Sequence, residues 1–117
     1  MSVQRVAYLV LRCADLERSR RFYEGLGLRL SPEQHGSGAK HYSCDVGGMI
    51  LELYPLSDRP TSGLRLGLVV SDLARVLESL RASGAVVGAV RAVGSEGSSP
   101  VTVIDPDGHW IALEQER

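Results

Sequence analysis

The chain repeats one structural pattern, and this repeat limits the folds that it can adopt. Two segments, "DLERSRRFYEGLG" and "DLARVLESLRASG", each combine an opening Asp, apolar residues at helical spacing and a closing Gly. Asp15 and Asp72 are 57 positions apart, as are Gly27 and Gly84. Because Asp caps helix N-termini and Gly follows helix C-termini, each segment predicts an amphipathic helix. The first apolar stripe comprises Leu16, Tyr23 and Leu26, with Phe22 beside it, and the second comprises Leu73, Val76, Leu77 and Leu80.

The strands repeat with the helices. Each helix segment follows an apolar stretch, and two later stretches, "DVGGMILELYP" and "DPDGHWIALEQ", align Gly48 with Gly108. Pro106 and Gly108 stand where a type I turn favours them, which predicts a hairpin over 105–108. The sequence therefore predicts an α+β protein of two tandem βαβββ modules. The expected strands cover residues 5–12, 28–34, 40–46, 49–55, 64–70, 86–93, 100–104 and 109–115.

A chain of 117 residues has the usual size of one domain, so we expect a single domain over residues 1–117. Within it, module one covers about residues 1–56, a linker covers 57–63, and module two covers 64–117. Two Gly/Ser-rich loops, 32–40 and 94–100, either cover a cleft or serve as plain surface connections.

Composition excludes several classes of partner. A formal net charge of −1 offers no electrostatic attraction for nucleic acid or for an anionic membrane. Arg5 and Arg12 interrupt the first apolar segment, and no apolar run is long enough to span a bilayer. We therefore expect a cytoplasmic protein, with Cys13 and Cys44 as reduced, buried thiols.

The two βαβββ modules, the "D-L-x-x-S-x-x-F-Y" motif opening at Asp15 and the hairpin over 105–108 together resemble the vicinal oxygen chelate superfamily. This superfamily includes glyoxalase I, extradiol dioxygenases, bleomycin-resistance proteins and fosfomycin-resistance enzymes. The resemblance implies two curved mixed sheets that enclose a cleft. In metal-dependent members, four side chains from the first and last strands of each module hold a divalent ion there. Such a fold does not by itself specify the chemistry.

The positions that correspond to these four metal ligands are Tyr8, Glu52, Arg65 and Ala112. A tyrosine phenol loses its proton only near pH 10, at about the ordinary pKa of the residue. An arginine is permanently cationic and has no lone pair to donate. Because Ala112 has no ligand atom and stable sites need three or four protein ligands, the resemblance implies a lost metal site and no cofactor.

The three histidines do not restore a metal site on the sequence alone. His35 lies in a Gly/Ser-rich loop, and His109 has the strand parity opposite to Trp110. His41 lies on a strand that could face the cleft, but one His together with Glu52 makes only a weak site.

If the four family positions converge, Arg65 lies close to Glu52 and forms an ion pair that replaces the charge of the metal. The alternative is that this pair only closes the cleft as a stabilising bridge. For Tyr54 and Trp110, packing in the sheet or at a subunit contact is the alternative to stacking on a ligand.

Strand alternation divides the sheet residues into two sets. The candidate ligand-binding residues are Tyr8, Arg12, Glu52, Tyr54, Arg65, Trp110 and Ala112, with Val10, Ile50, Gly67, Val69 and Glu114 on the same faces. The residues expected to face the helices and form the core are Leu9, Leu11, Leu51, Leu53, Leu66, Leu68, Ile111 and Leu113.

Four functions are consistent with these residues. The first is metal-independent binding of a small, aromatic or amphipathic molecule, similar to the bleomycin-resistance branch. The second is a metal-free isomerase or cyclase in which Glu52 acts as general acid or base and Arg65 or Tyr8 stabilises negative charge. The others are a metal-dependent glyoxalase or dioxygenase-like enzyme and a structural or regulatory dimer. We expect a homodimer, since members of the superfamily commonly pair and short sheets leave open edges.

Overall fold

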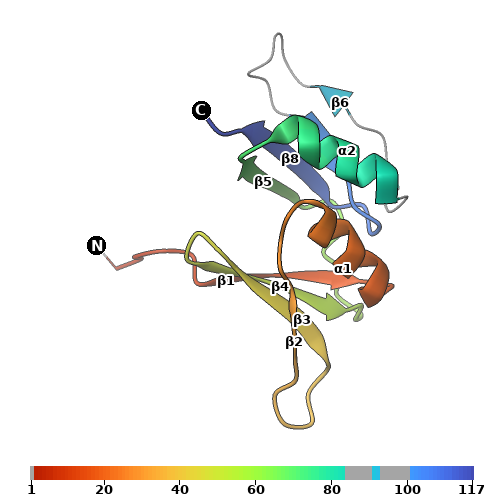
Figure 1. Ribbon diagram of the computed structural model, residues 1–117. Coiled ribbons are helices and arrows are strands. Elements are labelled where there is room, and N and C mark those ends of the chain that lie inside the picture. Colours follow the sequence, from red (N-terminus) through yellow and green to blue (C-terminus); the bar gives the residue numbers. More distant parts are fainter. Residues whose placement is uncertain (1, 84–90, 93–100) are drawn as a thin grey trace.

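The computed structural model describes residues 2–83, 91–92 and 101–117, and these residues form two sheets with one helix each (Figure 1). The predicted βαβββ order is confirmed in both modules. The elements of the first module are β1 (Tyr8–Cys13), α1 (Leu16–Gly25), β2 (Ser31–Glu33), β3 (His41–Val46) and β4 (Met49–Pro55). Those of the second are β5 (Arg65–Val70), α2 (Leu73–Ser83), β6 (Arg91–Ala92), β7 (Val101–Ile104) and β8 (Trp110–Gln115).

The two sheets have the same topology. The strand order is β1-β4-β3-β2 in the first sheet and β5-β8-β7-β6 in the second. The first and last strands of each module pair in parallel, and the other neighbours pair in antiparallel. Each sheet is therefore mixed, as the resemblance implies.

Some predicted strands are longer than the observed ones. β1 begins at Tyr8 and not at residue 5. β2 covers only Ser31–Glu33 of the predicted 28–34, because the residues after α1 end that helix first. Gly27 has a φ of 101°, and the N–H of Leu28 donates back to the Tyr23 carbonyl at 3.3 Å. The rest of the predicted strand 86–93 around β6, the loop 94–100 and Gly84 lie outside the described residues.

The predicted helix caps are present at both N-termini. The Asp15 carboxylate accepts a hydrogen bond from the Arg18 N–H at 3.1 Å, and Asp72 accepts one from the Arg75 N–H at 3.1 Å. Within the described residues, neither helix is long and apolar enough to cross a membrane.

Helices α1 and α2 cover one face of their sheets, and the predicted core lies there. Leu11, Leu51, Leu53, Ile111 and Leu113 are fully buried, together with Phe22 and Tyr23 of α1. Leu9, Leu66 and Leu68 are partly buried against the same cluster. The strand alternation thus gives the correct inward face in both sheets.

The two thiols are free and buried, as expected. Burial raises the pKa of Cys13 to about 12 and also raises the pKa of Cys44. Neither thiol therefore has the low pKa of a reactive cysteine.

A buried polar network, the Asp105 network of Tyr23, Thr61, Asp105 and His109, joins the two modules. The Asp105 carboxylate accepts hydrogen bonds from the Tyr23 hydroxyl at 2.5 Å and from His109 Nδ1 at 2.7 Å. Two backbone N–H groups of the hairpin also donate to it, each at 2.9 Å. His109 Nε2 is hydrogen-bonded to Thr61 Oγ1 at 2.7 Å, and that oxygen accepts from the Arg12 N–H at 2.9 Å. The network therefore connects α1, the linker, β1 and the β7–β8 hairpin.

Asp107 makes a second connection from the same hairpin. Its carboxylate accepts from the Ala14 N–H at 2.8 Å and from the Ser19 hydroxyl at 3.1 Å. The hairpin is thus bound to the first turn of α1 as well as to Tyr23 on the same helix.

The charge state of Asp105 contributes to stability. Burial acts to raise the pKa of Asp105, but the hydrogen bonds from His109 and Tyr23 outweigh burial and lower it below the usual 3.8. The pKa of Asp105 is lower in the folded protein than in the unfolded chain. Ionised Asp105 therefore stabilises the protein at pH values above the unfolded pKa, and this stabilisation is lost as the pH falls from there through the folded pKa. Burial, followed by the charge of Asp105, raises the pKa of Tyr23, so its hydroxyl remains a donor.

We predict that Asp105→Asn lowers the free energy of unfolding by about 3 kcal/mol at pH 7, because the amide cannot accept all four hydrogen bonds. Urea denaturation measures the change, with the exposed Asp58→Asn as the control. The variant should also lose less stability than the parent when the pH is lowered from 5 to 3. Equal stability of the two variants at pH 7 would contradict the role given to the network.

Candidate functional site

The helices leave the opposite face of each sheet uncovered, and we call these the free faces. The alternation that buries Leu9 and Leu11 directs Tyr8 and Arg12 to the free face of the first sheet. Three apolar residues stand out there: Tyr8 is 63% exposed, Val69 is 66% exposed and Trp110 is 37% exposed. The residues predicted to bind a ligand all lie on these two free faces.

A row of stacked side chains crosses the first free face. The Arg12 guanidinium lies over the Tyr54 ring, 5.1 Å from its centroid. The Tyr54 ring in turn stacks on the His41 ring, with centroids 4.1 Å apart and planes within 9° of parallel. Strand register explains the row, since Arg12 pairs with Tyr54 between β1 and β4 and His41 lies on the adjacent β3.

Glu52 lies next to this row on β4. Its side chain is 15% exposed, and Oε2 is 3.4 Å from His41 Nε2. Desolvation, followed by the negative charge of Glu52, raises the pKa of Tyr54, which keeps its hydroxyl protonated at neutral pH. The structure therefore brings together the predicted site residues Arg12, Glu52 and Tyr54, with His41 as a further member.

The second free face holds the other predicted residues. The Arg65 guanidinium lies over the Trp110 ring, 5.7 Å from its centroid. Ala112 pairs with Gly67 on β5 and with Thr102 on β7. Because Gly67 and Ala112 are small, the surface next to Trp110 has little side-chain bulk.

The expected ion pair between Arg65 and Glu52 does not form within the chain. Glu52 lies beside His41, and Arg65 lies over Trp110. Across residues 2–83, 91–92 and 101–117, no ion pair or ring contact joins the two free faces. The modules meet instead through α1 and α2 and through the Asp105 network, on the core side of both sheets.

Two hollows in the described part of the chain lie next to the helices and the edge of the first sheet. One, of about 440 Å³, lies between the C-terminal end of α1, β5 and the first turns of α2. The other, of about 380 Å³, lies at the edge of the first sheet and is lined in part by Glu33 and His41. None of the seven predicted ligand-binding residues lines either of these two hollows.

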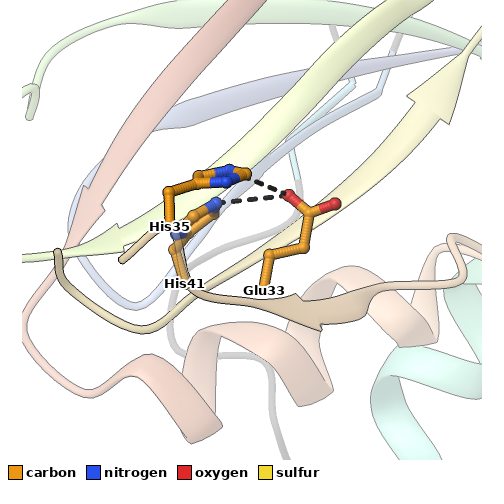
Figure 2. A group of neighbouring side chains, drawn as sticks. All are labelled: Glu33, His35 and His41. Atoms are coloured by element: carbon orange, nitrogen blue, oxygen red, sulfur yellow. Dashed lines mark ion pairs between the residues drawn. The ribbon is translucent and has the colours of Figure 1, made fainter. Parts of the chain in front are cut away.

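The structure also reveals a cluster that the sequence reasoning missed. Glu33, His35 and His41 direct side-chain ligand atoms toward one another, all within 4.8 Å (Figure 2). The sequence signal was a Glu and a His two residues apart, followed by a Gly/Ser-rich turn and a second His. Whether these three residues meet depends on the register in which β2 pairs with β3. The residue pattern alone does not specify that register.

The family metal position does not fit a divalent ion in this chain. Of its four residues, Glu52 offers a carboxylate, Tyr8 a largely exposed phenol, Arg65 a guanidinium and Ala112 no ligand atom. Tyr8 and Glu52 lie on one sheet, whereas Arg65 and Ala112 lie on the other. The chemistry of these side chains supplies one good ligand where stable sites need at least three.

Comparisons with known proteins agree with this architecture. The chain matches the family model of the Glyoxalase/Bleomycin resistance protein/Dioxygenase superfamily over residues 5–113. No curated protein matches it.

Solved structures cover almost the whole chain. TnmS3, an antibiotic binding protein from Streptomyces sp. CB03234, is 24% identical with a TM-score of 0.72, covering 100% of this chain and 99% of that one. A glyoxalase/bleomycin resistance protein from the same organism is 25% identical with a TM-score of 0.67, covering 95% and 100%. Virulence protein STM3117 from Salmonella typhimurium is 24% identical with a TM-score of 0.69, covering 100% of both chains. The chain therefore belongs to the glyoxalase/bleomycin resistance protein/dioxygenase superfamily.

Proposed function

We propose that this protein captures a small aromatic or amphipathic molecule on its free faces, with no metal ion at the family position. The observation that carries the proposal is the pair of exposed aromatic residues there, Tyr8 and Trp110, at 63% and 37% exposure. Exposed aromatic groups offer flat apolar surfaces on which another ring can stack. The description of TnmS3 as an antibiotic binding protein supports a binding function within this fold.

The two arginines define the chemistry of the ligand further. Arg12 and Arg65 each lie over an aromatic ring, so each face combines a cation with a flat apolar surface. A planar molecule with an acidic or strongly polar substituent satisfies both features. The cytoplasmic location and the lack of nucleic-acid partners remain predictions from composition.

The binding cleft is completed by a second copy of the chain. Among the described residues of one chain, no ion pair or ring contact joins the two free faces, and apolar Tyr8, Val69 and Trp110 are exposed on them. A homodimer that places the first free face of one copy against the second free face of the other removes this apolar surface from water. The same arrangement brings Glu52 and Arg65 together across the dimer.

We predict that Trp110→Ala weakens binding of an aromatic ligand by about thirtyfold or more, since truncation of a central aromatic commonly costs about 2 kcal/mol or more. Isothermal titration with bleomycin and with the aromatic anion 1-anilinonaphthalene-8-sulfonate measures the affinity. In the parent protein, Trp110 is the single tryptophan, so its fluorescence also reports ligand contact directly.

Leu56→Ala is the matched control, because Leu56 is 51% exposed and lies beyond the end of β4. It should bind each probe as the parent does. A folded Trp110→Ala variant with unchanged affinity for a probe that the parent binds would place the site elsewhere.

We predict a homodimer that Val69→Asp weakens at least tenfold, because the substitution removes apolar contact and adds an unpaired charge to the interface. Sedimentation equilibrium over a range of concentrations measures the dissociation constant. Val3→Asp, at a residue 79% exposed before the first strand, serves as the control. A parent protein that stays monomeric, or a Val69→Asp dimer of parental strength, would contradict this arrangement.

Acid or base chemistry at Glu52 is the second candidate function. The observation in its favour is the imidazole nitrogen of His41, 3.4 Å from the Glu52 carboxylate on the same free face. If Glu52 moves a proton, a bound ligand should be converted by the parent protein and remain unchanged with Glu52→Gln. Mass spectrometry and NMR of recovered ligand test this, and recovery of unaltered ligand from the parent supports capture alone.

A further inference from the structure

We propose that Glu33, His35 and His41 form a binding site for a divalent transition-metal ion such as Zn²⁺, with the Glu52 carboxylate as a neighbour 3.4 Å from His41 Nε2. We call this group the His35–His41 site. It lies at the edge of the first sheet, and none of these three residues belongs to the family metal position (Figure 2). The proposal does not depend on capture of a small molecule.

Local structure brings the ligand atoms together. Glu33 and His41 are direct cross-strand partners between β2 and β3. A tight turn returns the chain after β2, with the Gly38 N–H donating to the His35 carbonyl at 2.9 Å and Gly36 at a φ of 59°. This turn places the His35 ring 5.2 Å from the His41 ring, measured between centroids.

The contacts of His41 Nε2 have the spacing of ligand atoms around a tetrahedral ion, and the contact between His35 and Glu33 is slightly longer. His41 Nε2 is 3.3 Å from Glu33 Oε1 and 3.4 Å from Glu52 Oε2, and His35 Nε2 is 3.8 Å from Glu33 Oε1. Ligand atoms about 2.0–2.2 Å from a tetrahedral zinc ion lie roughly 3.3–3.6 Å from one another. Two imidazoles and carboxylate oxygen are also a ligand set that zinc uses.

The surroundings of His41 hold its ring as a metal ligand requires. The side chain is 1% exposed, and the ring is stacked on Tyr54. Nδ1 lies 3.1 Å from the Ala39 carbonyl, which can only accept, so Nδ1 carries a proton. This backbone contact is the usual second interaction of a metal-binding histidine, and it leaves Nε2 directed at the two carboxylates.

Electrostatics at the cluster favour a cation. Carboxylate oxygens of Glu33 and Glu52 both lie within 3.4 Å of the same ring nitrogen, close to the hydroxyl of Tyr54 at 3.3 Å. If Nε2 also carries a proton, that proton can be donated fully to only one of the two carboxylates. A divalent ion interacts with both carboxylates and with the nitrogen lone pair at once.

Another histidine–carboxylate group in the described residues differs from the His35–His41 site, because its oxygen atoms already accept hydrogen bonds. Asp105, Asp107 and His109 also bring ligand atoms within 4.8 Å of one another. There, however, the Asp105 carboxylate already has four donors, and Asp107 has two more. Those atoms are used by hydrogen bonds, whereas His35 is 75% exposed and open to an ion from solvent.

Isothermal titration of the untagged, chelator-treated protein with Zn²⁺ tests the site. We expect the parent to bind about one equivalent of Zn²⁺ per chain. His35→Gln and Glu33→Gln should each weaken the affinity for Zn²⁺ at least tenfold, because loss of a metal ligand costs at least as much as loss of a group that hydrogen-bonds to a ligand. Glu78→Gln is the control, since Glu78 is an exposed carboxylate on α2, on the helix-covered side of the other sheet, and it should bind as the parent does. Mg²⁺ should bind far more weakly, because imidazole ligands favour Zn²⁺.

Circular dichroism checks that each variant folds. We expect both variants to fold, because the side chains of His35 and Glu33 are 75% and 41% exposed. Cobalt substitution provides an independent readout, because tetrahedral Co²⁺ absorbs strongly in the visible range and should lose this band in His35→Gln. No Zn²⁺ binding to the parent, or equal binding to the parent and His35→Gln, would overturn the proposal. Failure of aromatic probes to bind would leave these results unaffected.

Discussion

The buried carboxylate of Asp105 is the interaction on which the arrangement of the two modules depends. It accepts four hydrogen bonds, from Tyr23, from His109 and from two backbone N–H groups of the hairpin. A buried charge is costly unless its hydrogen bonds are satisfied, and here they are. Because Tyr23 belongs to the first module and Asp105 to the second, the network attaches the modules on the core side of both sheets. The side chains of Tyr8 and Trp110, on the opposite faces, take no part in this network.

The free face of the first sheet owes its organisation to strand register. The register that aligns Leu11 with Leu53 in the core also aligns Arg12 with Tyr54 on the opposite side. Glu33 on β2 is likewise paired with His41 on β3. The row of side chains therefore runs from the Arg12 guanidinium through Tyr54 and His41 to the Glu33 carboxylate. The proposed His35–His41 site uses this alignment and lies on the same face as Glu52.

The sequence predicts the fold well because the repeat, the caps at Asp15 and Asp72 and the alternation in the strands are all local patterns. Alternation also correctly assigns Leu51 and Leu53 to the core and Glu52 to the opposite face. It cannot show how two sheets are placed relative to each other. Whether Arg65 meets Glu52 was therefore conditional, and within one chain the two residues have other partners. Glu33 was missed and His35 was set aside, because their proximity to His41 depends on a tight turn and on the pairing of β2 with β3.

The central claim is that metal-binding capacity lies at the His35–His41 site and not at the family position. The most direct measurement is a crystal structure of the protein grown with Zn²⁺, with anomalous diffraction recorded at the zinc absorption edge. We predict an anomalous peak between Glu33, His35 and His41, within reach of Glu52. A peak surrounded by Tyr8, Glu52, Arg65 and Ala112, or the absence of any peak at the cluster, would contradict the claim.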